Sequence, residues 1–122
     1  ARRHVLAAQY DALLADLPVG LPFRHPDNRS ALHLYPVLVP AQHRNRIFNA
    51  LRANGIGVNV HYIPVHTQPY YRKRFGFVAG DFPNAERYYA QAVSLPMYFS
   101  LSDEEQRFVA DVLRQALQEA AA

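Results

Sequence analysis

One stretch, Gly55–Tyr70, does most to restrict the folds open to this chain. It begins with a glycine that can end a helix and continues through a short β-branched strand. It leaves that strand in a loop with two prolines and two histidines. Proline has no N–H to donate to a sheet, so the strand must end near the first of them. A short strand placed directly after a helix predicts a small α+β unit rather than a long repetitive sheet.

The alternation of side chains within this strand predicts two different faces. Val58, Val60 and Tyr62 fall on one face of an extended chain and would pack against a core. Asn59 and His61 fall on the opposite face. Polar side chains at the end of a strand are a common way to build the wall of a ligand site. The same pattern also fits an ordinary strand with a proline-rich exit, and the pattern alone leaves both interpretations open.

Hydrophobic periodicity and turn residues predict the other elements in an alternating order. Leu6, Tyr10 and Leu14 belong to one apolar stripe of a first helix, which the proline-rich residues 18–22 end. Helices are expected at about 1–17, 42–53, 69–75, 83–92 and from Ser102 onward, and strands at about 30–39, 58–62 and 92–96. The predicted fold class is therefore α+β: a small mixed or antiparallel sheet of about three strands with helices packed on it.

The last helix has the clearest boundary signals in the chain. Ser102 and Glu105 have the spacing of a capping box, in which each satisfies a free backbone N–H of the other. Asn54 and Gly55 are typical of a helix C-terminus. Pro83 suits the first position of a helix, where its missing N–H has no partner to lose.

Composition excludes several classes of protein. The chain has 122 residues, of which 50% are hydrophobic and 19% are charged, a balance typical of one globular domain spanning residues 1–122. It has no cysteine, which excludes disulfides and zinc–thiolate sites and is compatible with a cytoplasmic location. The net charge of +3 is scattered rather than concentrated in a stripe. We therefore expect no nucleic acid as partner. No apolar run approaches the ~18 residues that a membrane span requires, so we expect no membrane partner either.

The usual catalytic motifs do not occur. His61 and His66 lack a third residue at usable spacing for a metal site. Lys73, the only lysine, lies between two arginines on an expected surface turn, whereas a Schiff-base lysine requires a desolvated pocket. Asp81 and Glu86 could form a carboxylate pair, but a loop acid and a helix-surface acid are the better explanation of the two residues. We predict no catalytic, cofactor-binding or metal-binding residue within the chain.

Five motifs, in the right order and covering essentially all of the chain, resemble one enzyme family. They are Ser30–Tyr35, Gly55–His66, Gln68–Tyr70, Gly80–Glu86 and Ser94–Pro96. Together they resemble the C-terminal part of the DegT/DnrJ/StrS sugar aminotransferases. These fold type I enzymes use pyridoxal phosphate (PLP) to aminate keto-sugar nucleotides, with glutamate as the usual amino donor.

The resemblance implies that this chain is the small C-terminal domain of a longer enzyme. In that family the Schiff-base lysine and the other PLP-binding residues lie in a large N-terminal domain, so PLP would be bound there and not here. The expected partners are that PLP domain, a nucleotide-sugar substrate and a second subunit in a homodimer. The small domain supplies part of the substrate wall. The residues that match this wall, and that we predict to bind substrate, are His61, Tyr62, His66, Gln68 and Tyr70.

The beginning of the sequence bears on the alternative interpretation. Ala1 is followed at once by a helical pattern, without a capping residue, which favours a chain cut from a longer protein with residues 1–17 as the end of an interdomain helix. The fragment alone is then expected to be inactive. The alternative is a stand-alone α/β module that binds small ligands without catalysis. A lysine-bearing PLP domain encoded upstream would favour the first hypothesis.

Overall fold

Helices and two short strands alternate along the chain in a computed structural model that describes all 122 residues. The elements are α1 (Arg2–Leu14), β1 (Tyr35–Leu38), the 3-10 turn η1 (Ala41–His43), α2 (Arg44–Ala53), the 3-10 turn η2 (Val65–Thr67), α3 (Pro69–Phe75), α4 (Pro83–Gln91), β2 (Ala92–Leu95) and α5 (Asp103–Ala121). The predicted α+β class is confirmed. None of the helices is both long and apolar enough to cross a membrane.

The sheet consists of β1 and β2 paired antiparallel, with Tyr35 opposite Leu95 and Leu38 opposite Ala92. A single bridge extends it on each side: Gly20 pairs with Leu38, and Asn59 pairs with Ser94. The third strand predicted at 58–62 is thus reduced to one bridging residue.

The predicted strand at 30–39 is also shorter than expected, because only its second half pairs with β2. Leu32 has a φ of 50°, outside the extended region, so residues 30–34 cannot continue the strand. The backbone N–H of Leu32 donates to the hydroxyl of Ser30, which closes a local turn in place of a ladder bond.

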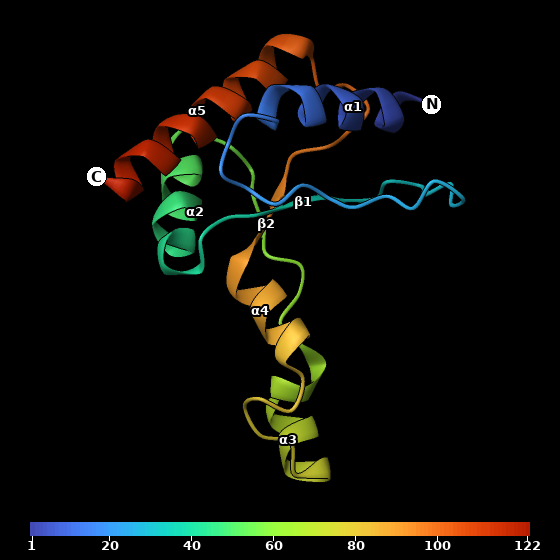
Figure 1. Cartoon of the computed structure of the whole chain (residues 1–122), viewed down its shortest axis with the longest axis vertical. Helices are drawn as coiled ribbons and strands as arrows, with labels where there is room; N and C mark the ends of the chain where they lie inside the picture. The colour runs from blue at the N-terminus through green and yellow to red at the C-terminus, as the bar shows by residue number, and fades with distance from the viewer.

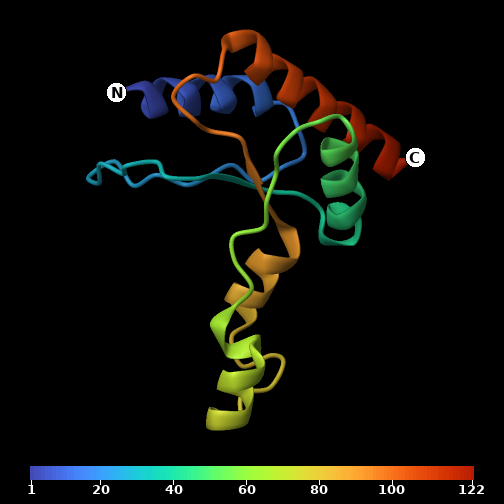
Figure 2. The ribbon, with the colours of Figure 1, turned by 180° about the vertical axis from the view of Figure 1, so that it is seen from behind.

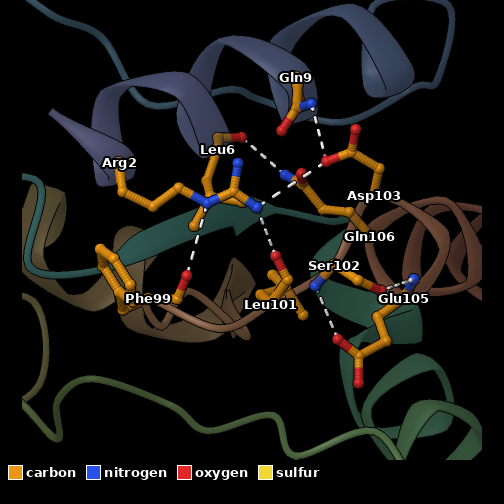
Figure 3. Close-up of polar contacts among 9 residues, drawn as sticks. All are labelled: Arg2, Leu6, Gln9, Phe99, Leu101, Ser102, Asp103, Glu105 and Gln106. Atoms are coloured by element: carbon orange, nitrogen blue, oxygen red, sulfur yellow. Dashed lines mark hydrogen bonds and ion pairs between the residues drawn. The ribbon is translucent and has the colours of Figure 1, made fainter.

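Several helix ends lie where local sequence signals place them, but α1 ends at Leu14, three residues before the predicted end at residue 17. Ser102 and Glu105 form both bonds of the capping box, drawn in Figure 3. Gly55 and Gly76 have φ values of 77° and 73°, a left-handed conformation that glycine adopts without a steric penalty just after α2 and α3. Pro83 occupies the first turn of α4, as predicted.

The core lies where α1, α2 and α5 cover the sheet (Figure 1). Leu6, Tyr10 and Leu14 of α1 are fully buried, which confirms the predicted stripe. Burial raises the pKa of the Tyr10 hydroxyl well above its ordinary value, and this hydroxyl donates to the carbonyl oxygen of Pro96 at 2.9 Å.

Polar contacts join α1 to the beginning of α5, although the two helices are at opposite ends of the chain (Figure 3). The guanidinium of Arg2 donates to the carbonyl oxygen of Leu101 at 2.6 Å, and the side-chain amide of Gln106 donates to the carbonyl oxygen of Leu6 at 2.6 Å. Gln106 is buried, so its bond to a backbone carbonyl compensates part of the cost of placing an amide in the core.

Residues 61–91 form an arm that projects from this core and contains η2, α3 and α4 (Figures 1 and 2). The chain runs out through 61–75 and returns through α4 directly into β2. The arm therefore begins and ends beside the same strand, since Asn59 pairs with Ser94 of β2.

Candidate functional site

A segment at the base of the arm, residues 61–66, is held at both ends by histidine side chains. Nδ1 of His61 forms a hydrogen bond with the hydroxyl of Ser94, at 2.9 Å. Nε2 of His66 lies 2.8 Å from a carboxylate oxygen of Glu86. Both partners belong to the continuous stretch of α4 and β2, so the segment is fastened along one side to a single part of the fold.

Between these two points the segment presents apolar and aromatic side chains to the outside. Tyr62 is 67% exposed and Ile63 is 53% exposed. The Tyr62 ring lies edge-on to the His61 ring, with centroids 4.6 Å apart, so the two predicted ligand residues are neighbours in space. The peptide bond that joins them is cis.

The orientation predicted from strand alternation is wrong for Tyr62. Val58 is buried as expected and Val60 is half-buried, but Tyr62 faces outward. Backbone pairing with β2 stops at Asn59, and beyond that residue no ladder fixes the alternation of side chains. His61, expected to face away from the core, turns its ring toward the buried Ser94.

His66 is the most enclosed of the five predicted site residues, with 7% of its surface exposed. Its ring packs against Phe82, with centroids 4.7 Å apart. The carboxylate of Glu86 accepts from His66 and also from the backbone N–H of Gly80, at 2.9 and 3.1 Å to its two oxygens. The hydrogen bond from His66, followed by the one from Gly80, holds the pKa of Glu86 below its ordinary value.

Gln68 and Tyr70 lie further along the arm, at the start of α3, and both are exposed. Tyr70 meets the ring of Tyr71 edge-on, with centroids 5.3 Å apart. No hydrogen bond or ring contact joins either residue to His61 or Tyr62. The structure therefore brings His61 and Tyr62 together and places Gln68 and Tyr70 at the start of α3. His66 lies between these two pairs, in η2.

The arm also carries an apolar groove of about 480 Å³. It is lined by Pro64, Val65, His66, Tyr71, Phe75, Phe77, Phe82 and Ala85. His66 thus has one face in the groove and its Nε2 atom on Glu86. A second cavity, of about 380 Å³, lies beside Gly55 and Gly57, where the chain approaches the segment from α2.

The residues of this chain do not fit a PLP site. Lys73 is exposed in the last turn of α3, between Arg72 and Arg74. A lysine that forms a Schiff base needs a desolvated pocket, and the exposed position of Lys73 does not provide one. No cluster of three or more His, Cys, Asp or Glu residues is placed to hold a metal ion.

Sequence reasoning missed two functional contacts. Ser94 gave no signal beyond being a hydroxyl inside an apolar strand, where a buried side chain usually has a partner. For Glu86 the sequence suggests either a carboxylate pair with Asp81 or an acid on a helix surface, and neither interpretation points to His66. In the structure Asp81 instead accepts from the backbone N–H of Val78, while Glu86 bonds His66.

Comparisons with known proteins agree on one family. The profile of the DegT/DnrJ/EryC1/StrS aminotransferase family matches residues 1–114. The spore coat polysaccharide biosynthesis protein SpsC of Bacillus subtilis is 42% identical over 120 residues, covering 93% of this chain and 31% of SpsC.

Solved structures give the same result. DesV of S. venezuelae, in complex with a ketimine intermediate, superposes with a TM-score of 0.88 at 35% identity, covering 96% of this chain and 31% of DesV. PseC of Helicobacter pylori, an aminotransferase involved in the biosynthesis of pseudoaminic acid, superposes with a TM-score of 0.87 at 25% identity, covering 97% of this chain and 32% of PseC. The chain spans about a third of the length of these relatives.

Proposed function

The chain belongs to the DegT/DnrJ/EryC1/StrS aminotransferase family, and we propose that it is the C-terminal domain of a PLP-dependent enzyme that aminates a keto-sugar nucleotide. The amino group would come from an amino acid, glutamate in our proposal. The product would enter surface-polysaccharide or nonulosonic acid biosynthesis in the cytoplasm. The observation that carries this proposal is the match of the family profile over residues 1–114.

In this proposal, the 61–66 segment forms part of the substrate wall. The half-buried His61 and the exposed Tyr62 are in contact, and together they offer a ring nitrogen, a phenol and aromatic faces. An imidazole or a phenol can hydrogen-bond a sugar hydroxyl or a phosphate oxygen, and an aromatic face can stack on a sugar or a base. The segment would bind and orient the nucleotide sugar, while the reacting groups would come from elsewhere in the enzyme.

The other three predicted residues have different parts in this proposal. Gln68 and Tyr70 are exposed and would contact the substrate from α3, further from the arm's base. His66 borders the apolar groove with the small exposed part of its ring. It would contact substrate only at the edge of the wall.

PLP, which supplies the chemistry of amino transfer, would be held by a large domain outside these 122 residues. Residues 1–17 would be the end of a helix from that domain, and two complete subunits would form a homodimer. The exposed setting of Lys73 supports this division, because a Schiff-base lysine is expected in a desolvated pocket. The fragment alone would therefore neither transaminate nor retain PLP.

A narrower proposal concerns the acceptor. The motif at residues 33–36 and the helix residues 46–51 most resemble the transaminase that forms UDP-4-amino-4,6-dideoxy-N-acetyl-β-L-altrosamine. We therefore propose the corresponding UDP-linked 4-keto sugar as the first acceptor to be tested. dTDP-linked keto sugars are the informative comparison, since they share the diphosphate and differ in base and sugar.

The test uses the full-length protein and the 122-residue chain side by side. We expect the full-length protein to aminate a keto-sugar nucleotide with glutamate. The chain alone should show no activity and no dialysis-resistant PLP absorbance. A stoichiometric PLP band on the chain that Lys73→Ala abolishes would contradict this division. Ligand binding by a complete protein that has no PLP domain would favour the stand-alone binding module instead.

A further inference from the structure

All side-chain hydrogen bonds of Glu86 are made within the arm, where they join residue 66 to the loop at residue 80. We propose that Glu86 is a positioning residue for the substrate wall, fixing His66 and thereby the course of residues 61–66 that presents Tyr62. This inference rests on the function proposed above. Glu86 would not touch the substrate itself; it would act through His66 and through the loop that ends at Gly80.

Both carboxylate oxygens of Glu86 have hydrogen-bond partners within the arm. One oxygen lies 2.8 Å from Nε2 of His66, and both oxygens accept from the N–H of Gly80. Hydrogen bonds to an ionised acceptor are stronger and better directed than bonds between neutral groups. Gly80 has a φ of 97°, a conformation in which other side chains are strained, so the loop can bring this N–H to the carboxylate because the residue is glycine.

The segment that these bonds hold has little backbone support of its own. Residues 60–63 make no backbone–backbone hydrogen bond. The N–H of Val60 donates only to the side chain of Asn59, and backbone pairing resumes at Pro64, whose carbonyl accepts from Thr67. The position of the exposed residues in between therefore depends on the side-chain contacts at the two ends.

The residues that bind the two ends of the segment lie on one uninterrupted stretch of chain, formed by α4 and β2. His61 is bonded to Ser94 on β2, and His66 is bonded to Glu86 on α4. No loop separates α4 from β2, because Gln91 is followed directly by Ala92. Figures 1 and 2 both show the outgoing segment running beside α4. Releasing His66 would free one end of the segment while the other end stays attached to the sheet.

Aromatic side chains pack around His66 and help to fix the position of its ring. Phe82 packs against the imidazole, and Phe77 packs edge-on against Phe82, with centroids 5.4 Å apart. A buried imidazole whose carboxylate partner is removed leaves a polar atom unpaired in an apolar setting, which is costly. Without Glu86 the ring should therefore leave this site, and η2 should shift with it.

The test compares Glu86→Ala, Glu86→Gln and the control Glu119→Gln in the full-length enzyme. Glu119 also carries one negative charge, and its only contact is with Gln115 on the same helix. For Glu86→Ala we expect KM for the nucleotide sugar to rise about tenfold, the equivalent of losing one hydrogen bond of about 1.4 kcal/mol. KM for glutamate, kcat and the PLP absorbance should stay close to wild type.

Glu86→Gln supplies the rescue measurement. Its amide can accept from Gly80 and donate to a neutral His66, so it should restore most of the affinity for the nucleotide sugar. An unchanged KM for the nucleotide sugar in Glu86→Ala would overturn the inference while the enzyme's activity supports the proposed function. If Glu86→Ala does not fold, Glu86→Asp decides, because its carboxylate is one methylene shorter and should not keep the bonds to both His66 and Gly80. Lowered thermal stability with an unchanged KM in Glu86→Asp would show a purely structural residue. A wild type that aminates no acceptor would overturn both proposals.

Discussion

At the scale of single residues, His61 and Tyr62 are adjacent in the chain but occupy different environments. His61 is half-buried and bonded to Ser94, whereas Tyr62 projects outward. In the proposed substrate wall, Tyr62 offers the larger free surface and His61 offers an anchored ring. Substitutions at the two positions should therefore differ in their effects on stability.

For His61→Ala in the full-length enzyme, we expect kcat/KM for the nucleotide sugar to fall by about one to two decades. The loss of one hydrogen bond to substrate corresponds to about 1–3 kcal/mol, more if the partner is a phosphate. Steady-state kinetics and thermal unfolding of the same variant provide the measurement, with the exposed His25→Ala as control. Lowered stability with unchanged kcat/KM would remove His61 from the site and leave it as an anchor to Ser94.

The lowered pKa of Glu86 leads to a prediction about acid. A carboxyl whose pKa is lower in the folded state binds its proton less tightly there, so it stabilises the fold at pH values above its ordinary range of about 4.3. That contribution is lost as pH falls through the lowered value. Hydrogen exchange of the arm should therefore differ most between wild type and Glu86→Gln near neutral pH. The difference should shrink as the pH falls through the lowered pKa of Glu86. A difference independent of pH would exclude an ionised Glu86 as its cause.

At the scale of elements, helix ends follow local rules while strand lengths do not. The Ser102 capping box, Gly76 after α3 and Pro83 in the first turn of α4 all lie where the sequence predicts them. The strand predicted at 30–39 pairs over only four residues, because pairing needs a partner strand that a local pattern does not specify.

The capping box gives a prediction for α5. Ser102→Ala removes the acceptor for the N–H of Glu105 and should lower the free energy of unfolding by about 1 kcal/mol. Urea unfolding of the 122-residue chain gives the measurement. Ser100→Ala serves as the control, because Ser100 is exposed and lies just before the cap. Equal effects of the two substitutions would contradict a specific role for the cap.

At the scale of the whole molecule, large apolar side chains are concentrated on the surface of the arm, although some are also exposed elsewhere. The core buries the stripe of α1 and most of the apolar face of α5. The arm instead exposes a set of large apolar side chains: Ile63, Val65, Tyr70, Tyr71, Phe75, Val78 and Phe82. An apolar surface of this kind is unusual on a soluble monomer.

We therefore expect the 122-residue chain to self-associate through the arm. Light scattering at increasing concentration and the binding of a hydrophobic dye provide the measurement. Phe75→Ser, on the wall of the apolar groove, should reduce both signals. Phe23→Ser is the matched control, because Phe23 is 85% exposed but lies on the loop before β1. A clean monomer that binds no dye would contradict the prediction.

Local chemistry in the sequence determined the α+β class, the helix boundaries and the apolar stripe of α1. Each of these depends on residues within one or two turns of one another: a cap, a left-handed glycine, or a spacing of three and four. The resemblance to one family, carried by five short motifs, also came from the sequence and agrees with the family profile over residues 1–114.

Only the tertiary structure decided which of the predicted site residues face outward and which are held within the fold. Ser94 lies 33 positions from His61, and Glu86 lies 20 positions from His66. Contacts over such separations depend on the path of the chain through the arm and back into β2, which no local period encodes. Strand alternation failed at Tyr62 because side chains alternate dependably only where backbone pairing holds the strand extended, and that pairing ends at Asn59.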